Sequence, residues 1–182
     1  MTRATARVWT AWLLLPAAAL AATLLSAQTA VRLTATVVPT TGQPAVHTLA
    51  VTGSGFPAGT IPPGNVTLTF QPTTPGAGPS ASGAAAGVAT IMGTTRRVFF
   101  RIPAAIAVTT PTPYVISMAG QTAAGVSFSS SNAAALTVNP PSEFTQLEPR
   151  SARPGESVSV AITTRYTDFT QGATMAAWGP GI

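Results

Sequence analysis

The side chains that most often carry enzymatic chemistry are scarce in this sequence. His47 is the only histidine and cysteine is absent, so a Ser-His-Asp triad would have to use His47. Zinc sites built from His and Cys need several such ligands, and disulfides and thiolate nucleophiles need Cys. His47 falls in a predicted strand, and we interpret it as a surface or hydrogen-bonded structural residue rather than a catalytic base.

Carboxylates are the next candidates, and the chain has four, at Glu143, Glu148, Glu156 and Asp168. Glycoside hydrolysis needs two carboxylates that flank the scissile bond, and a calcium site needs clustered oxygen ligands. The four acids fall on predicted turns and strand ends of the C-terminal part, and Asp168 stands alone. We therefore predict no catalytic residue, no metal site and no cofactor, and we expect that the chain is not an enzyme.

The third group is a cluster of arginines at Arg96, Arg97 and Arg101. Arg97 and Arg101 share one face of a predicted strand, and Phe99 lies between them on that face. A strip of arginine and aromatic side chains suits a polyanion, such as an acidic polysaccharide or a nucleic acid. The alternative interpretation is that these charges protect an edge strand from pairing with another sheet.

Low charge and high apolar content together predict a packed domain of short strands. Charged residues make up 7% of the 182 residues and hydrophobic residues 46%, with 16 Gly and 17 Pro to form turns. The formal charge of +5 includes Arg3 and Arg7; without these two, seven Arg face four acids, a net charge of +3. So small an excess does not by itself indicate nucleic-acid binding, and we predict no nucleic-acid partner.

Residues 1–27 have the order of parts found in an export signal. Arg3 and Arg7 form a positive start, an uncharged apolar stretch follows, and small residues end the segment at Ala27. We predict a signal-peptide helix that is cleaved after Ala27, or alternatively after Ala30. The other interpretation is an uncleaved membrane anchor, because about 18 apolar residues are near the lower limit for a bilayer span. Both interpretations place the rest of the chain outside the cytoplasm, in a secreted or cell-surface protein.

From residue 31 to residue 139 the hydrophobic residues recur with a period of two. Such alternation gives each strand one buried and one solvated face, as in antiparallel sheets. With Gly87–Met92 we count about eight strands between Gly and Pro turns, which favours a β-sandwich. We interpret Gln71–Gly87, which is nearly all small residues, Pro and Thr, as a passive loop rather than a binding loop. The alternating residues are Val31, Leu33, Ala35, Val37, Leu49, Val51, Val66, Leu68, Phe70, Val98, Phe100, Ile102, Tyr114, Ile116, Met118, Val126, Phe128, Leu136 and Val138.

The turn Gly53-Ser54-Gly55-Phe56-Pro57-Ala58-Gly59 resembles the G-x-G-F-x-x-G turn of IPT/TIG-type immunoglobulin-like domains. The closing strand Leu136-Thr137-Val138 is similar to the last strand of that family. The resemblance implies an all-β, immunoglobulin-like β-sandwich with Greek-key antiparallel sheets over residues 31–139. Elementary chemistry agrees, because both glycines permit positive φ and Phe56 supplies core area at a strand end.

Residues 142–182 follow a stiff Asn139-Pro140-Pro141 junction and resemble a bacterial immunoglobulin-like repeat of large surface proteins. Related domains form one structural part of quinohemoprotein amine dehydrogenase, whose cofactor-bearing parts have no counterpart here. Pro154-Gly155 predicts a tight turn, and the alternation in Val158–Ile162 predicts a strand. The matching residues are Leu147-x-Pro149, Ala152-x-Pro154-Gly155, Val158–Ile162, Tyr166-Thr167-Asp168-Phe169-x-Gln171-Gly172 and Trp178-Gly179-Pro180-Gly181-Ile182.

In that repeat further strands follow the residues that match Gly179-Pro180-Gly181-Ile182, so we expect 142–182 to be a partial second module. Three explanations stay open: the chain is a fragment of a longer one, another chain donates the missing strands, or the tail packs on the first module or stays loose. The sequence as a whole predicts a non-catalytic structural or adhesive module. The alternatives are an accessory, carbohydrate-binding module of an extracellular enzyme and a strand-donating filament subunit. The expected partners are a protein or a cell-surface polysaccharide, a second copy bound through the partial module, and the membrane only through an uncleaved leader.

Overall fold

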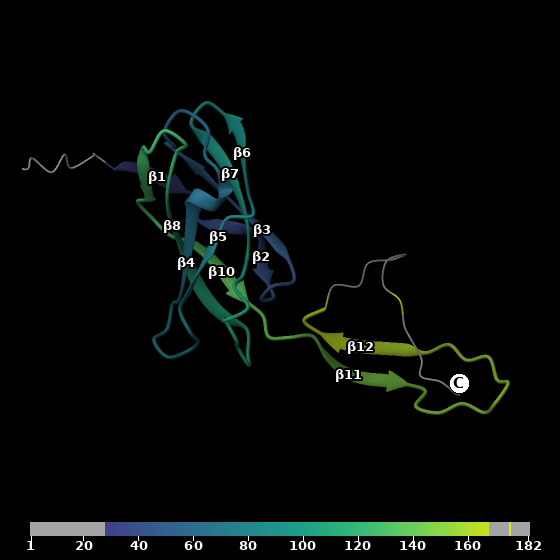
Figure 1. Ribbon diagram of the computed structural model, residues 1–182. Helices are drawn as coiled ribbons and strands as arrows, with labels where there is room; N and C mark the ends of the chain where they lie inside the picture. Colours follow the sequence, from purple (N-terminus) through teal and green to yellow (C-terminus); the bar gives the residue numbers. More distant parts are fainter. Residues whose placement is uncertain (1–27, 168–174, 176–182) are drawn as a thin grey trace, which may run out of the picture.

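The computed structural model of the protein describes residues 28–167 and residue 175, so the predicted leader at 1–27 lies outside the described residues (Figure 1). The described part is all-β, as predicted, and apart from one short 3-10 turn it consists of strands and their connections. It contains no helix long and apolar enough to cross a membrane. The elements are β1 (Thr29–Leu33), β2 (Thr36–Gly42), β3 (Thr48–Ser54), η1 (Pro63–Asn65), β4 (Val66–Pro72), β5 (Ala81–Ala84), β6 (Gly87–Met92), β7 (Thr95–Arg101), β8 (Thr112–Gln121), β9 (Ser127–Ser130), β10 (Ala134–Val138), β11 (Glu143–Glu148) and β12 (Ala161–Arg165).

Strands β1 to β10 form a sandwich of two layers. In the first layer, which we call the β4/β8 sheet, β5 pairs with β4 and β4 with β8, and β9 and β10 share the other edge of β8. In the second layer, the β3/β7 sheet, β7 lies between β3 and β6. All these pairs are antiparallel, which allows the short connections between β6 and β7 and between β8 and β9.

The two layers are joined on one side by strands that pair with both of them, and on the other side by a short connection of the chain. On one side β1 pairs with β9 and with β3, and β2 pairs with β10 and with β3. On the other side the chain leaves β5 and enters β6, and the crossing is held by two backbone hydrogen bonds. The amide of Ala85 donates to the Val66 carbonyl at 2.9 Å, and the amide of Ala86 donates to the Phe99 carbonyl at 2.7 Å. On this side β5 pairs with β4 and β6 with β7, so the connection between β5 and β6 links the two layers.

The core lies between the layers and is built from the inward-facing residues of both. The alternation predicted from the sequence is confirmed on most strands: Leu68 and Phe70 on β4 and Val98 and Phe100 on β7 are all fully buried. The rings of Phe70 and Phe100 meet edge to face with centroids 5.8 Å apart, which joins the two layers at the centre. Two residues of the predicted pattern depart from it: Ala35 is exposed between β1 and β2, and Val126 is 43% exposed before β9.

The stretch Gln71–Gly87 is not one loop. Strand β4 continues to Pro72, β5 pairs with it from Ala81 to Ala84, and Gly87 begins β6, so the connections are residues 73–80 and 85–86. The composition of β5, with only Ala, Ser and Gly, carries no strand signal, and pairing with β4 decides its conformation. The interpretation of this whole stretch as a passive loop was therefore wrong in its extent.

The predicted glycine turn after β3 has the expected shape, but its two glycines serve different needs. Gly55 has φ +82°, which side-chain-bearing residues rarely adopt, as predicted. Gly53 does not have positive φ; a Cβ there would lie 2.9 Å from the Phe56 ring and 3.0 Å from Val31, so this position needs the absence of a side chain. Phe56 is buried and its ring meets that of Phe128 edge to face at 5.3 Å.

Tyr114, at the start of β8, anchors the loop of residues 73–80. Its side chain is fully buried, and its hydroxyl donates a hydrogen bond to the Pro79 carbonyl at 3.1 Å. Gly78 lies so close to this hydroxyl that a Cβ there would come within 2.3 Å of it. Burial withdraws the phenol from water and so raises the pKa of Tyr114 above its ordinary value near 10.

We expect the stability of the protein to fall as the pH rises above about 10, and Tyr114→Phe to remove much of this dependence. In the unfolded chain the phenol ionises near its ordinary pKa, while the folded chain still holds the proton, so the unfolded state is favoured by up to about 1.4 kcal/mol per pH unit. Lys and Cys, which would titrate in the same range, are absent. The measurement is urea unfolding of both proteins between pH 8 and pH 11 (~3 pH units). An unchanged pH slope in the variant would show that Tyr114 is not the group responsible.

The described part of the predicted second module contains a two-stranded sheet of β11 and β12, set apart from the sandwich in Figure 1. The predicted tight turn is present: Gly155 has φ +80° and the Glu156 amide donates to the Arg153 carbonyl at 3.0 Å. The predicted strand Val158–Ile162 is displaced toward the C-terminus, because β12 begins only at Ala161.

Gln43 connects the sandwich with the second module. It follows β2, its side chain is buried, and its amide nitrogen donates to the Pro140 carbonyl at 3.0 Å and to the Ser142 hydroxyl at 3.1 Å. The carbonyl of Tyr166, just beyond β12, is a third acceptor beside the same nitrogen, so its two N–H groups are shared among three acceptors. One side chain of the first module therefore holds both the junction and the far end of the strand pair.

Candidate functional site

The charged residues of the sandwich all lie in or beside the β3/β7 sheet. Residues 28–142 contain four arginines and no acidic residue. Arg32 is in β1, where it pairs with Ser54 of β3, and the other three, Arg96, Arg97 and Arg101, are in β7. The strands β4, β5, β8, β9 and β10 of the opposite sheet carry no charge. The sandwich therefore has one basic and one uncharged sheet.

Strand β7 separates its three arginines between its two faces. Arg97 and Arg101 point outward and are exposed, with the half-buried Phe99 between them, as the period of two predicts. Arg96 lies on the opposite face and is only 7% exposed. Its guanidinium donates to the carbonyls of Gly93 at 3.1 Å and Gly59 at 3.4 Å, so it ties two loops together. Arg96 is therefore apart from the face that Arg97 and Arg101 form.

The interpretation of these charges as protection of an edge strand is wrong, because β7 is an inner strand. It pairs with β3 on one side and with β6 on the other. In this register Phe99 has Ala50 of β3 and Gly87 of β6 as its direct neighbours. A Cβ on Gly87 would lie 3.5 Å from Cδ2 of Phe99, so the aromatic ring extends over the glycine. The small neighbours leave one side of the ring accessible.

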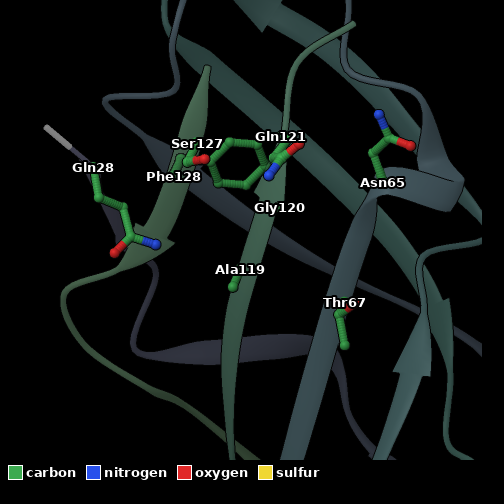
Figure 2. A pocket seen from close by; sticks show the side chains of 8 residues that line it. All are labelled: Gln28, Asn65, Thr67, Ala119, Gly120, Gln121, Ser127 and Phe128. Carbon is green, nitrogen blue, oxygen red and sulfur yellow. The ribbon is translucent and has the colours of Figure 1, made fainter. Parts of the chain in front are cut away.

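An open pocket of about 310 Å³ lies at the end of the β4/β8 sheet (Figure 2). In this view Gln28 lies on one side and Asn65 on the other, with Gln121 and the Phe128 ring between them. Its lining has amides and hydroxyls but no ionisable side chain, so it can form hydrogen bonds and cannot supply acid–base catalysis at neutral pH. The lining residues are Gln28, Asn65, Thr67, Ala119, Gly120, Gln121, Ser127 and Phe128.

Two of the acidic residues considered from the sequence form local hydrogen bonds in the described structure. Glu148 accepts a hydrogen bond from Gln146 within β11 at 2.6 Å, and Glu156 accepts one from the Arg153 amide at 3.0 Å, so both serve local structure. Among residues 28–167 and 175, no three His, Cys, Asp or Glu gather as a metal site would require. Asp168 lies outside the described residues.

His47 is half-buried and directly precedes β3, rather than lying within a strand as predicted. The residue that connects the modules, Gln43, and the lining of the pocket were not found from the sequence. Their partners come from segments far apart in the chain, 97 residues for Gln43 and Pro140, and single amides carry no motif.

Comparisons with known proteins found no match for this chain: no family model, no curated protein and no solved structure is similar to it. The resemblances to IPT/TIG-type domains and to bacterial surface repeats therefore stay predictions that rest on the short motifs quoted above.

Proposed function

We propose that this chain is a non-catalytic structural and adhesive part of a secreted or cell-surface protein, with an immunoglobulin-like sandwich as its first module. Two features support the proposal: the two layers of the sandwich are joined on both sides, and the β3/β7 sheet carries arginines but no acidic residue. The first gives a firm unit and the second a surface for contact. Neither feature offers a group for bond-breaking chemistry.

The observation that carries the proposal is the junction held by Gln43. A spacer between two modules works only if it keeps their relative orientation, and a single Pro-rich link leaves rotation open around its other bonds. The buried amide of Gln43 adds hydrogen bonds to the link at Pro140 and Ser142 and to the strand pair at Tyr166. The side chain of Gln43 is buried, and its bond to Pro140 is shielded from competition with water.

Gln43→Ala is expected to free the strand pair of β11 and β12 from the sandwich while the sandwich itself stays folded. The substitution leaves the Pro140 and Tyr166 carbonyls without this donor, a loss of about 1–3 kcal/mol at the junction. The measurement is ¹⁵N relaxation, which gives a rotational correlation time for each module. In the native protein the two modules are expected to tumble together, and in the variant the strand pair is expected to tumble faster.

The matched control is Gln71→Ala, which removes an exposed glutamine from β4 and is expected to change neither correlation time. Two different correlation times in the native protein would contradict the spacer proposal directly. If the variant still tumbles as one body, Gln43 is not the residue that fixes the orientation of the two modules.

The proposed location rests on the leader at residues 1–27, whose positive start, apolar middle and small end are the parts that export requires. N-terminal sequencing of the protein recovered outside the cell tests it. A first residue of Gln28 or Val31 would support cleavage, and recovery of the protein only inside the cell would contradict export.

A further inference from the structure

The outer side of the β3/β7 sheet carries three positive charges that nothing in the described part of the chain neutralises. Arg32, Arg97 and Arg101 are exposed, and none of them forms an ion pair or a side-chain hydrogen bond with another described residue. With Phe99 they form what we call the basic face. The described acids, at Glu143 and beyond, lie in the second module, so no acidic residue of the sandwich offsets this field.

The strand geometry fixes the spacing of these charges. Arg97 and Arg101 are four residues apart on one strand, so their Cα atoms are about 13 Å apart and Phe99 lies midway. Arg32 on β1 lies two strands from β7, about 10 Å across the sheet. On the intervening strand β3, its partner Ser54 is two residues from Thr52, the partner of Arg97. The charges therefore follow a bent line over the sheet rather than a compact cluster.

The residues beside Arg97 and Phe99 on the neighbouring strands have small side chains. Thr52 and Ala50 of β3 and Gly87 and Ala89 of β6 flank Arg97 and Phe99. A line of separated cations suits an extended chain with regular negative charges better than a small anion, which would need converging donors. Each guanidinium can hold a carboxylate through two parallel hydrogen bonds, which Lys cannot do.

Phe99 distinguishes a polysaccharide from other polyanions. A single half-buried ring with one accessible side can meet the C–H groups of a sugar ring, because the face of an aromatic ring is electron-rich. Nucleic-acid surfaces usually offer several stacking aromatics and more phosphate contacts than three arginines supply. The combination favours a chain of sugars that bear carboxylates.

We propose that the basic face binds a linear acidic polysaccharide of uronate type, with carboxylates on Arg97 and Arg101, a sugar ring on Phe99 and the chain extending toward Arg32. Arg96, which the sequence grouped with these residues, takes no part because its guanidinium is buried and hydrogen-bonded within the fold. The inference rests on the proposed adhesive function and names its partner.

The test is a calorimetric titration of the full chain with an oligogalacturonate at low and at physiological salt. Arg97→Gln/Arg101→Gln is expected to weaken binding about tenfold at low salt and to flatten its salt dependence. The matched control is Arg150→Gln/Arg153→Gln, which removes the same charge from exposed positions of the second module and is expected to bind like the native protein. Equal weakening by both double variants would mean that only the net charge matters, and it would overturn the site. Absence of binding by the native protein would also overturn it.

Two further probes fix the class of ligand. The methyl ester of the same oligomer keeps the rings but loses the charge, and it is expected to lose binding; retained binding would contradict the role of the arginines. A single-stranded DNA of equal length is expected to bind more weakly, and equal or tighter binding would overturn the polysaccharide in favour of a nucleic acid. Thermal unfolding of each variant confirms that it is folded. The spacer role is tested by tumbling instead, so either proposal can fail while the other stands.

Discussion

Phe100→Ala is expected to lower the free energy of unfolding by about 3–5 kcal/mol, the largest effect of any single substitution discussed for this protein. The side chain is fully buried on β7, opposite Leu49 of β3, and its ring meets Phe70 of the other layer. Truncation loses the free energy gained by burying the ring away from water, and it also loses the contacts of the ring with the other layer. Neighbouring strands on both sides of β7 limit how far the cavity can collapse, which places the loss in the upper part of that range.

Urea unfolding of the native and variant proteins measures this loss, and Phe144→Ala is its matched control. Phe144 lies on β11 with 78% of its surface exposed, so the same truncation there is expected to change stability by less than about 0.5 kcal/mol. Because a domain has only about 5–15 kcal/mol of stability, Phe100→Leu serves as a milder second variant with a loss near 1.5 kcal/mol. Equal losses of stability for Phe100→Ala and Phe144→Ala would contradict the packing of the Phe100 side chain in the core.

Gly120→Ala is expected to cost about 1–3 kcal/mol, although it adds a single methyl group near the surface. Gly120 lies on β8 opposite Val66, and a Cβ there would come within 2.5 Å of the Asn65 carbonyl oxygen and 2.8 Å of the Phe128 ring. The first of these atoms belongs to the backbone of η1, directly before β4, and cannot rotate away. The two strands would have to separate locally, at the place where the pocket of Figure 2 lies.

The control for this substitution is Gly64→Ala in the 3-10 turn, where an added Cβ meets nothing within 4 Å and φ is not positive. Its effect on stability is expected to be neutral or slightly favourable, because Ala restricts the unfolded chain. Chemical denaturation of both variants gives the comparison. A Gly120→Ala protein as stable as the Gly64→Ala protein would show that β4 and β8 are not packed as closely as their register requires.

The all-β class and the inward-facing residues of β4, β7 and β8 were predictable, because a strict period of two has one structural explanation. What the period cannot tell is which strands are neighbours. The position of β7 between β3 and β6 excludes edge protection for Arg97 and Arg101, and only the pairing could show this. The alternation places Arg96 on the inward face of β7. It does not show that the carbonyls of Gly93 and Gly59 accept hydrogen bonds from its guanidinium there.

Other features lacked a local signal. Ile106 and Val108 are buried in the connection between β7 and β8, where no strand forms and no periodicity appears. Strand β5 has neither β-branched nor aromatic residues, and Gln43 reads as an ordinary turn residue. Each of these conformations is decided by partners distant in sequence, and tertiary context then overrides local propensity.

The parallel pairing of the first strands with the last ones determines how the sandwich carries a pull along the chain. β2 runs parallel to β10, and β1 parallel to β9, so the entry of β2 and the exit of β10 lie at opposite ends of one ladder. Tension applied between the preceding and following segments is directed along these strands. It loads the hydrogen bonds of the ladder together, in shear, whereas a hairpin at the same place would open one bond after another. When the sandwich is under tension, its resistance to unfolding therefore follows from the order and direction of its strands.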